Sequence, residues 1–267
     1  MCPSPPCAIL AAQGGFTMEP KLRTVNRVTP PPYELNRFPA RFLEKLGAEI
    51  AYMQATKETM SLEGSEWEQI FASCIGAHWV PSNVGLDDVQ LDSTCWSAKT
   101  VYGGSNLGTQ KKVRLISGRN SPVYSFGEEE ITPSADPNHV GKLVLDIWNE
   151  RISSIREQFK YTRTVVLVKS KDFSDFLIFE TNAIRYDPEL YRFEWNSRGN
   201  LEGYDKRTNE HSFTWQPHGS QFTIIEAIPS DRLHIQIKKP EKVDKDVILK
   251  SIGFDKSWVM VLHDEIE

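Results

Sequence analysis

The chain has 267 residues, of which 25% are charged and 39% apolar, and its formal net charge is −5. This composition is ordinary for a globular protein and excludes a collagen-like, coiled-coil or disordered chain. The acidic balance excludes a general basic coat for nucleic acid, but it leaves room for a local basic cleft.

No apolar run is long enough to span a bilayer, and the apolar run 8–12 lacks the basic residues that begin a signal peptide. The four cysteines form no CxxC pair, so neither a structural zinc site nor a disulfide framework is predicted. A reducing cytoplasm is therefore the expected location. Residues 1–32, which are rich in proline, are predicted to form a loose N-terminal tail.

Residues 33–267 are predicted to form a single α/β domain with a mixed central β-sheet flanked by helices. Apolar side chains at helical spacing predict four helices, at about 39–56, from Ser65 to 75, at 139–158 and near 245–252. Ser65 and Glu68 have the spacing of a capping box at the start of the second helix. Strands are predicted at 113–116, 164–168, 176–180 and 233–237, with further strands and long loops between 191 and 228.

Two short strands on either side of the polar turn 92–95 predict a β-hairpin. Alternation gives each face its own residues: Val89, Leu91, Trp96 and Ala98 on the apolar face, and Asp88, Gln90, Ser97 and Lys99 on the polar one. This register sets Asp88 opposite Lys99, whereas Asp87 falls on the apolar face. An acid and a lysine are therefore expected side by side, with a hydroxyl next to them.

An acid and a lysine in this arrangement suit metal-dependent hydrolysis of a phosphodiester. A carboxylate binds a hard divalent cation through oxygen, and the cation neutralises charge on the phosphate and lowers the pKa of its water. A nearby lysine orients or deprotonates that water and stabilises the developing charge.

Asp88-Val89, the segment Ser97-Ala98-Lys99 and the acidic helix segment 64–71 together resemble the PD-(D/E)xK nuclease superfamily, in particular type II restriction endonucleases. The resemblance implies that Asp88 binds the metal, that Lys99 is the catalytic lysine and that Glu68 is the helix acid. It also implies that the backbone carbonyl of Ala98 is a metal ligand. Ser97 stands where the family pattern has an acid, so Glu68 or another glutamate would supply that charge.

The same resemblance implies a restriction-endonuclease-like fold and a magnesium-dependent enzyme that cuts duplex DNA at a specific short sequence. A homodimer is expected, because both strands must be cut. A β-rich part near 186–230 is expected to recognise DNA, since Arg suits guanine and Asn or Gln suits adenine. The candidate DNA-binding residues are Arg119, Asn120, Ser121, Arg192, Asn196, Arg198, Asn200, Gln216, His218 and Gln221.

Other interpretations of the same residues stay open. Asp88 and Lys99 also fit an ordinary cross-strand ion pair, and Glu68 fits a capping partner. The aromatic and polar C-terminal half also fits a non-catalytic module that binds DNA or RNA. A hydrolase with Cys95 as nucleophile and a histidine as base is a third class, although no glycine-shaped elbow surrounds Cys95.

Overall fold

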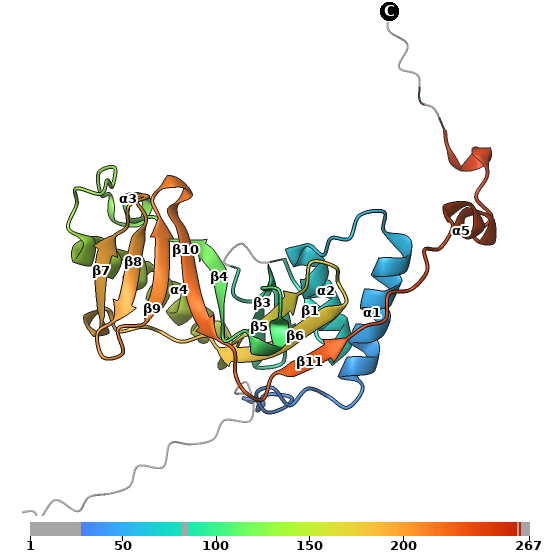
Figure 1. The fold of residues 1–267 in the computed structure, drawn as a ribbon, viewed down its shortest axis with the longest axis horizontal. Coiled ribbons are helices and arrows are strands. Elements are labelled where there is room, and N and C mark those ends of the chain that lie inside the picture. The colour runs from blue at the N-terminus through green and yellow to red at the C-terminus, as the bar shows by residue number, and fades with distance from the viewer. Residues whose placement is uncertain (1–27, 82–84, 261, 263–267) are drawn as a thin grey trace, which may run out of the picture.

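The structure is a computed structural model that describes residues 28–81, 85–260 and 262. Its α-helices are α1 (Phe42–Thr56), α2 (Gly64–Ile75), α3 (Pro122–Phe126), α4 (Pro137–Gln158) and α5 (Lys245–Ser251). Two β-sheets lie side by side, and α5 projects away from the body of the molecule (Figure 1). The protein is therefore a mixed α/β fold, as expected, but with two sheets in place of the one predicted.

The first sheet has six strands in the order β1-β2-β3-β5-β6-β11. Their bounds are β1 (His78–Trp79), β2 (Val89–Leu91), β3 (Thr94–Tyr102), β5 (Tyr161–Lys169), β6 (Asp175–Asn182) and β11 (Leu233–Gln236). β3 and β5 are parallel and the other neighbours are antiparallel, so this sheet is mixed, as expected. Helices α1 and α2 cover one face, where Trp67 and Phe71 pack against Trp96.

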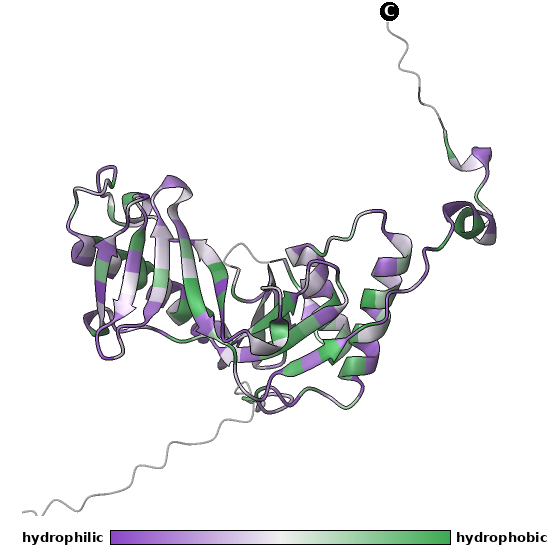
Figure 2. Ribbon diagram, viewed as in Figure 1, coloured by the Kyte–Doolittle hydropathy of each residue, from purple (hydrophilic) through white to green (hydrophobic). Residues whose placement is uncertain are grey.

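The second sheet has five antiparallel strands in the order β4-β10-β9-β8-β7. Their bounds are β4 (Lys112–Arg119), β7 (Tyr191–Trp195), β8 (Leu201–Asp205), β9 (His211–Gln216) and β10 (Gln221–Ala227). Apolar and polar residues alternate along these strands (Figure 2), and the apolar set packs against α4. Val113 and Leu115 of β4 instead pack on the first sheet, so β4 joins the two sheets.

The hairpin of β2 and β3 has a tighter turn than predicted. Val89 pairs with Trp96 and Leu91 with Thr94, which leaves only Asp92 and Ser93 in the turn. The predicted register, which paired Val89 with Ala98 and set Asp88 opposite Lys99, is therefore wrong by two residues, and Asp88 lies just before β2. A shift of two keeps every side chain on its expected face, because side chains alternate with a period of two.

The start of α2 also differs from the prediction. The capping box is formed by Glu63 and Glu66, and the helix begins at Gly64, so Ser65 already lies in the first turn. Glu68 therefore does not serve as the predicted capping partner of Ser65.

A buried ion pair fixes the segment before α1 to the first sheet. Glu180 is 1% exposed, and its carboxylate accepts a hydrogen bond from Arg163 Nη1 at 3.2 Å. The same carboxylate accepts hydrogen bonds from Tyr33 Oη at 2.9 Å and Trp96 Nε1 at 2.6 Å. Arg163 thus has a structural partner in the buried carboxylate of Glu180.

Two helical glycines are expected to respond in opposite ways to alanine. A Cβ on Gly141 of α4 would lie 2.2 Å from the ring of Phe193, whereas nothing lies within 4 Å of one on Gly47 of α1. Gly141→Ala should cost about 1–3 kcal/mol through overpacking. Gly47→Ala should gain up to about 1 kcal/mol of helix propensity. Urea unfolding of both variants measures the difference, and equal stabilities would contradict the packing of α4 on β7.

Only residues 28–32 of the predicted tail 1–32 lie within the described part, and they form neither helix nor strand. No helix within the described residues is long and apolar enough to cross a membrane.

Candidate functional site

The candidate site lies where β3 runs past the end of β2. β2 pairs with β3 only as far as Trp96, so within the described residues the following part of β3 has a strand on one side only. The backbone N–H of Ala98 on this open edge is near enough to the carboxylate of Asp88 to lower the pKa of that group. Since the N–H and C=O of one strand residue point the same way, the Ala98 carbonyl lies along the same edge.

The charged residues predicted for the site come together here. Asp88 is 5% exposed, and burial raises the pKa of its carboxyl to about 6. The positive charge of Lys99 and the Ala98 N–H lower that pKa, while the charge of Glu68 raises it. Burial lowers the pKa of the Lys99 ammonium, and Asp88 and Glu68 oppose this effect. Because these groups act on one another electrostatically, the hairpin and α2 share one site.

Glu68 reaches this site from α2 and is held by Trp79. The indole Nε1 of Trp79 donates to Glu68 Oε2 at 3.0 Å. Trp79 belongs to β1, which pairs with β2 beside Asp88. Sequence reasoning missed Trp79, and no pattern around it indicated a contact with the helix acid.

A cleft of about 420 Å³ opens beside these residues. Glu68, Ala98 and Lys99 line it, together with two cations from other strands, Arg114 of β4 and Lys169 of β5. Two carboxylates, Glu63 and Glu68, line the same cleft, so positive and negative groups meet there.

Arg151 of α4 is the main residue that sequence reasoning missed. Its Nη1 donates to Ser117 O at 2.7 Å and to Asn120 Oδ1 at 3.1 Å. Burial lowers the pKa of its guanidinium, and the charge of Asp88 raises it. Its charge in turn lowers the pKa of Lys99. The signal in the sequence is a charged residue at helical spacing within the apolar stripe 144–155.

Gly118→Ala is expected to disturb the site through Arg151. Gly118 has φ 110°, and a Cβ there would lie 2.6 Å from the Arg151 guanidinium nitrogens. Gly127, at φ 72° with nothing within 4 Å of an added Cβ, is the matched control for backbone strain alone. DNA-cleavage assays measure the effect. The rate of Gly118→Ala should be at least tenfold lower than that of Gly127→Ala, a difference of about 1.4 kcal/mol. Equal activities would show that displacing Arg151 has no consequence.

Ser97 occupies the position of the missing acid but does not line the cleft. Its side chain is 1% exposed, and its Oγ donates to the carbonyl of Gly85 at 2.8 Å. The hydroxyl therefore holds the loop that leads to Asp88. This placement gives Ser97 a positioning role, although the resemblance sets it among the candidate catalytic residues.

Most of the predicted DNA-binding residues gather at one end of the second sheet. Gln221 pairs with both Gln216 and Arg119, and the β7–β8 turn lies beside them because Leu201 pairs with Trp215. The exposed members of this set are Arg119, Arg198 and His218, and the half-buried members are Asn196, Asn200, Gln216 and Gln221. These residues form a group that we call the turn end of the second sheet.

Asn120 does not fit the predicted contact with DNA. It is 0% exposed, and its Nδ2 donates to Val144 O at 2.9 Å. Trp215 Nε1 also donates to its carbonyl at 2.7 Å. The residue is thus a structural link between β4, α4 and β9. The polar side chain of Asn120 is thus explained by its buried hydrogen bonds and not by contact with DNA.

Three further candidates have local hydrogen bonds. Ser121 Oγ accepts from Tyr124 N at 3.3 Å and so caps α3. Asn196 Oδ1 accepts from the backbone N–H groups of Arg198 and Asn200, which shapes the β7–β8 turn. Arg192 lies away from the turn end and pairs with Glu194, two residues further along β7, at 2.7 Å.

The oxygen donors of the site fit one hard cation. Among the described residues there is no group of three or more His, Cys, Asp or Glu side chains placed to hold a metal. Asp88 and Glu68 instead offer two carboxylates, and Ala98 offers a backbone carbonyl. The negative charge of Glu68 raises the pKa of Asp88, and a bound divalent cation would offset this repulsion; Mg²⁺ keeps several waters when few protein ligands are present. The residues therefore fit one Mg²⁺. Ser97 stands at the position two residues before Lys99 where the family pattern has a further acid.

The cysteine hydrolase is not supported by the geometry. Cys95 is 0% exposed, and burial raises the pKa of its thiol to about 12, whereas a nucleophile needs a thiolate near neutral pH. His211, one of the candidate bases, instead contacts Phe213 O and Thr214 Oγ1 within β9.

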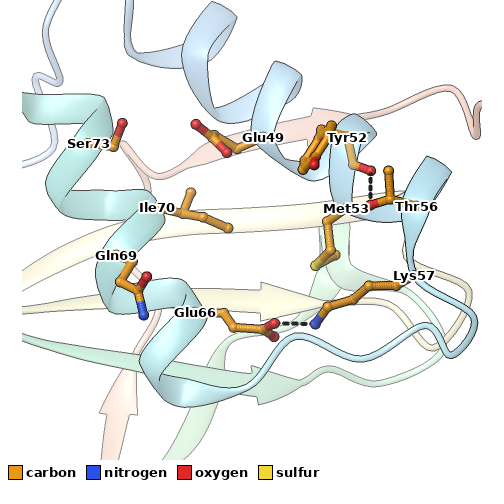
Figure 3. A pocket seen from close by; sticks show the side chains of 9 residues that line it. All are labelled: Glu49, Tyr52, Met53, Thr56, Lys57, Glu66, Gln69, Ile70 and Ser73. Carbon is orange, nitrogen blue, oxygen red and sulfur yellow. Dashed lines mark hydrogen bonds and ion pairs between the residues drawn. The ribbon is translucent and has the colours of Figure 1, made fainter. Parts of the chain in front are cut away.

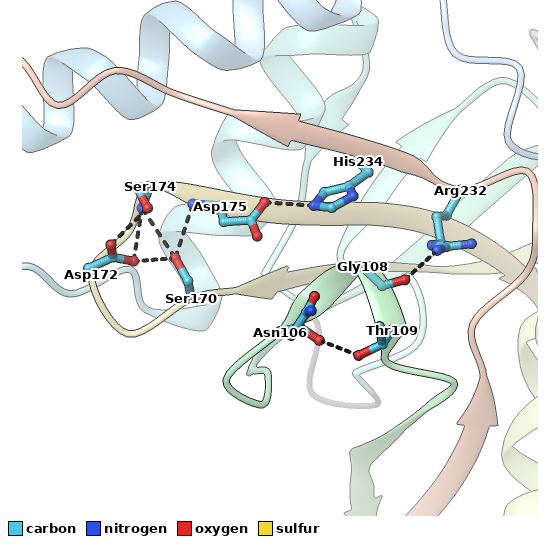
Figure 4. A network of polar contacts seen from close by, with 9 residues as sticks. All are labelled: Asn106, Gly108, Thr109, Ser170, Asp172, Ser174, Asp175, Arg232 and His234. Atoms are coloured by element: carbon cyan, nitrogen blue, oxygen red, sulfur yellow. Dashed lines mark hydrogen bonds and ion pairs between the residues drawn. The ribbon is translucent and has the colours of Figure 1, made fainter.

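Two other polar regions lack a reactive arrangement. A cavity of about 470 Å³ between α1 and α2 contains the ion pair of Lys57 and Glu66 (Figure 3), which ties the two helices together. On the first sheet, His234 Nε2 lies 2.7 Å from Asp175 Oδ1, but the serine hydroxyls nearby donate to Asp172 and not to His234 (Figure 4). Neither region combines a nucleophile with a base.

No family model, curated protein or solved structure matches this chain. The case for its function therefore depends on the geometry of the site.

Proposed function

We propose that the protein is a magnesium-dependent endodeoxyribonuclease that hydrolyses phosphodiester bonds in duplex DNA. The observation that carries this proposal is the convergence of Glu68, Asp88, Ala98 and Lys99. These residues come from a helix, a loop and a strand, and they meet beside a cleft with three cations. An ordinary ion pair between Asp88 and Lys99 would require neither Glu68 from α2 nor the open edge of β3.

The roles of the residues follow from their chemistry. Asp88, Glu68 and the Ala98 carbonyl would hold Mg²⁺, which when bound neutralises phosphate charge and makes its water more acidic. Lys99, with its pKa lowered by burial, is suited to orient the attacking water and to stabilise the pentavalent phosphate. Arg151 adds a second positive charge that faces Asp88 from α4.

Sequence specificity and a dimer are part of the same proposal. The turn end of the second sheet presents arginine, asparagine, glutamine and histidine side chains, which suit base edges in the major groove. Cutting both strands at a palindromic site calls for two copies related by a two-fold axis.

Incubation of the full chain with phage DNA tests the proposal. Discrete fragments in Mg²⁺, and binding without cutting in Ca²⁺, are the expected results. Smeared products would support a nuclease without sequence specificity. A gel shift without cutting in either cation would support the non-catalytic DNA- or RNA-binding module instead, and no binding to either nucleic acid would contradict both.

A further inference from the structure

Lys169 is a buried cation at the edge of the cleft. Its side chain is 4% exposed, and its Nζ donates to the carbonyl of Leu62 at 2.5 Å. The ammonium also lies 4.7 Å from the ring centroid of Tyr102 and 5.5 Å from that of Phe173. This arrangement holds the ammonium in one place, where it lines the cleft.

The charge of Lys169 has no close counter-ion. It forms no ion pair within the described residues, and Glu63 and Glu66 act on it only through space. Burial lowers the pKa of its ammonium. A buried charge without a counter-ion is costly, so an anion in the cleft would offset this cost. A purely structural tie to Leu62 would not require a cation.

Two further groups of the same cleft are suited to an anion. The Oγ1 of Thr100 is buried and has no hydrogen-bond partner among the described residues. Arg114 lines the cleft from β4 and donates Nη2 to Thr214 Oγ1 at 3.2 Å, which leaves its other donors available.

The position of this group relative to the candidate active site follows from the strand register. Lys169 pairs with Tyr102, which lies three residues beyond Lys99 on β3. At about 3.3 Å per residue, the two lysines are separated by roughly 10 Å along the strand. One phosphate cannot engage both, but neighbouring phosphates of one nucleic-acid strand can.

We infer that Lys169, Thr100 and Arg114 form a second phosphate subsite, which binds a backbone phosphate adjacent to the one cut beside Lys99. This inference rests on the proposed function, because it assumes that the cleft holds a polynucleotide. A second phosphate contact would fix the direction in which the nucleic-acid strand runs through the cleft.

The salt dependence of DNA binding tests the subsite. Each phosphate contact contributes about 0.9 to the slope of log Kd against log salt concentration. With a duplex oligonucleotide in Ca²⁺, Lys169→Met should lower that slope by about 0.9 relative to the wild type. Lys171→Met, an exposed lysine two residues away, should leave it unchanged. A purely structural lysine would change the melting temperature but not the slope.

Arg114→Gln provides a second variant if Lys169→Met does not fold, and it should lower the slope by a similar amount. Suppose that the wild type binds and cuts DNA. An unchanged slope in whichever of Lys169→Met and Arg114→Gln fold would then overturn the subsite and leave the proposed function intact. A wild type that binds no DNA would overturn the proposed function as well.

Discussion

Asp88→Asn is expected to abolish DNA cleavage and, at the same time, to stabilise the fold at pH 8. The loss of charge stabilisation at the metal is worth several kcal/mol, which corresponds to at least ~1,000-fold in rate. Asparagine relieves the cost of a buried carboxylate, since burial raises the pKa of Asp88 from 3.8 to about 6. Removing that cost should add about 1–2 kcal/mol to the free energy of unfolding, a gain that is reduced because Lys99 then loses a partner.

The pH dependence of this gain has a definite sign. Above pH 6 the carboxyl is ionised in both the native and the unfolded state, so its full cost is present in the wild type. As the pH falls through 6 the native group binds a proton, and the cost disappears by about its ordinary pKa of 3.8. The variant should therefore melt a few degrees above the wild type at pH 8, and this difference should shrink towards pH 4.

Thermal unfolding in EDTA measures this difference without a contribution from bound metal. Asp92→Asn is the matched control, because Asp92 is exposed in the hairpin turn at φ 51°, a conformation that asparagine tolerates. It should change neither the melting temperature nor cleavage. A destabilised Asp88→Asn variant at pH 8 would show that Asp88 is an ordinary structural ion-pair partner.

Glu180→Ala is expected to have the largest effect on stability. The substitution leaves the buried Arg163 without a counter-ion and removes the acceptor of Tyr33, Asn36 and Trp96. Breaking a buried pair in this way costs about 3–5 kcal/mol. The melting temperature should therefore fall by about 10 °C or more.

Glu194→Ala is the control for this prediction. Glu194 pairs with Arg192 at 2.7 Å, but both side chains are at least 40% exposed. Such a pair contributes at most about 1 kcal/mol. The double variant Glu180→Ala, Arg163→Met should recover part of the loss, since it removes the unpaired charge. Similar losses of stability in Glu180→Ala and Glu194→Ala would mean that the segment before α1 is not anchored by this network.

The alternation of the hairpin was sufficient to predict which residues share a face. The residues of the paired strands keep their expected faces even though the turn is two residues shorter than predicted, because a shift of two preserves the faces. The shift itself was not predictable from composition, since Asp92 takes a positive φ that permits the tight turn.

Long-range packing explains what the sequence did not reveal. Nothing local distinguishes the polar Asn120 in a loop from a recognition residue, yet three partners from distant elements bury it. Arg151 and Lys169 reach the site from α4 and β5, far along the chain from the hairpin. The division into two sheets likewise depends on β4 pairing with β10 across more than a hundred residues.

Single-turnover cleavage of a plasmid by Lys99→Met is the most direct test of the central claim, that Lys99 and the two acids form a hydrolytic site. Lys160→Met, at an exposed position just before β5, is its matched control. We predict that the wild type and Lys160→Met cut the plasmid in Mg²⁺ and that Lys99→Met binds DNA but cuts at least ~100-fold more slowly. Cleavage by Lys99→Met at the wild-type rate would contradict the assignment of this site.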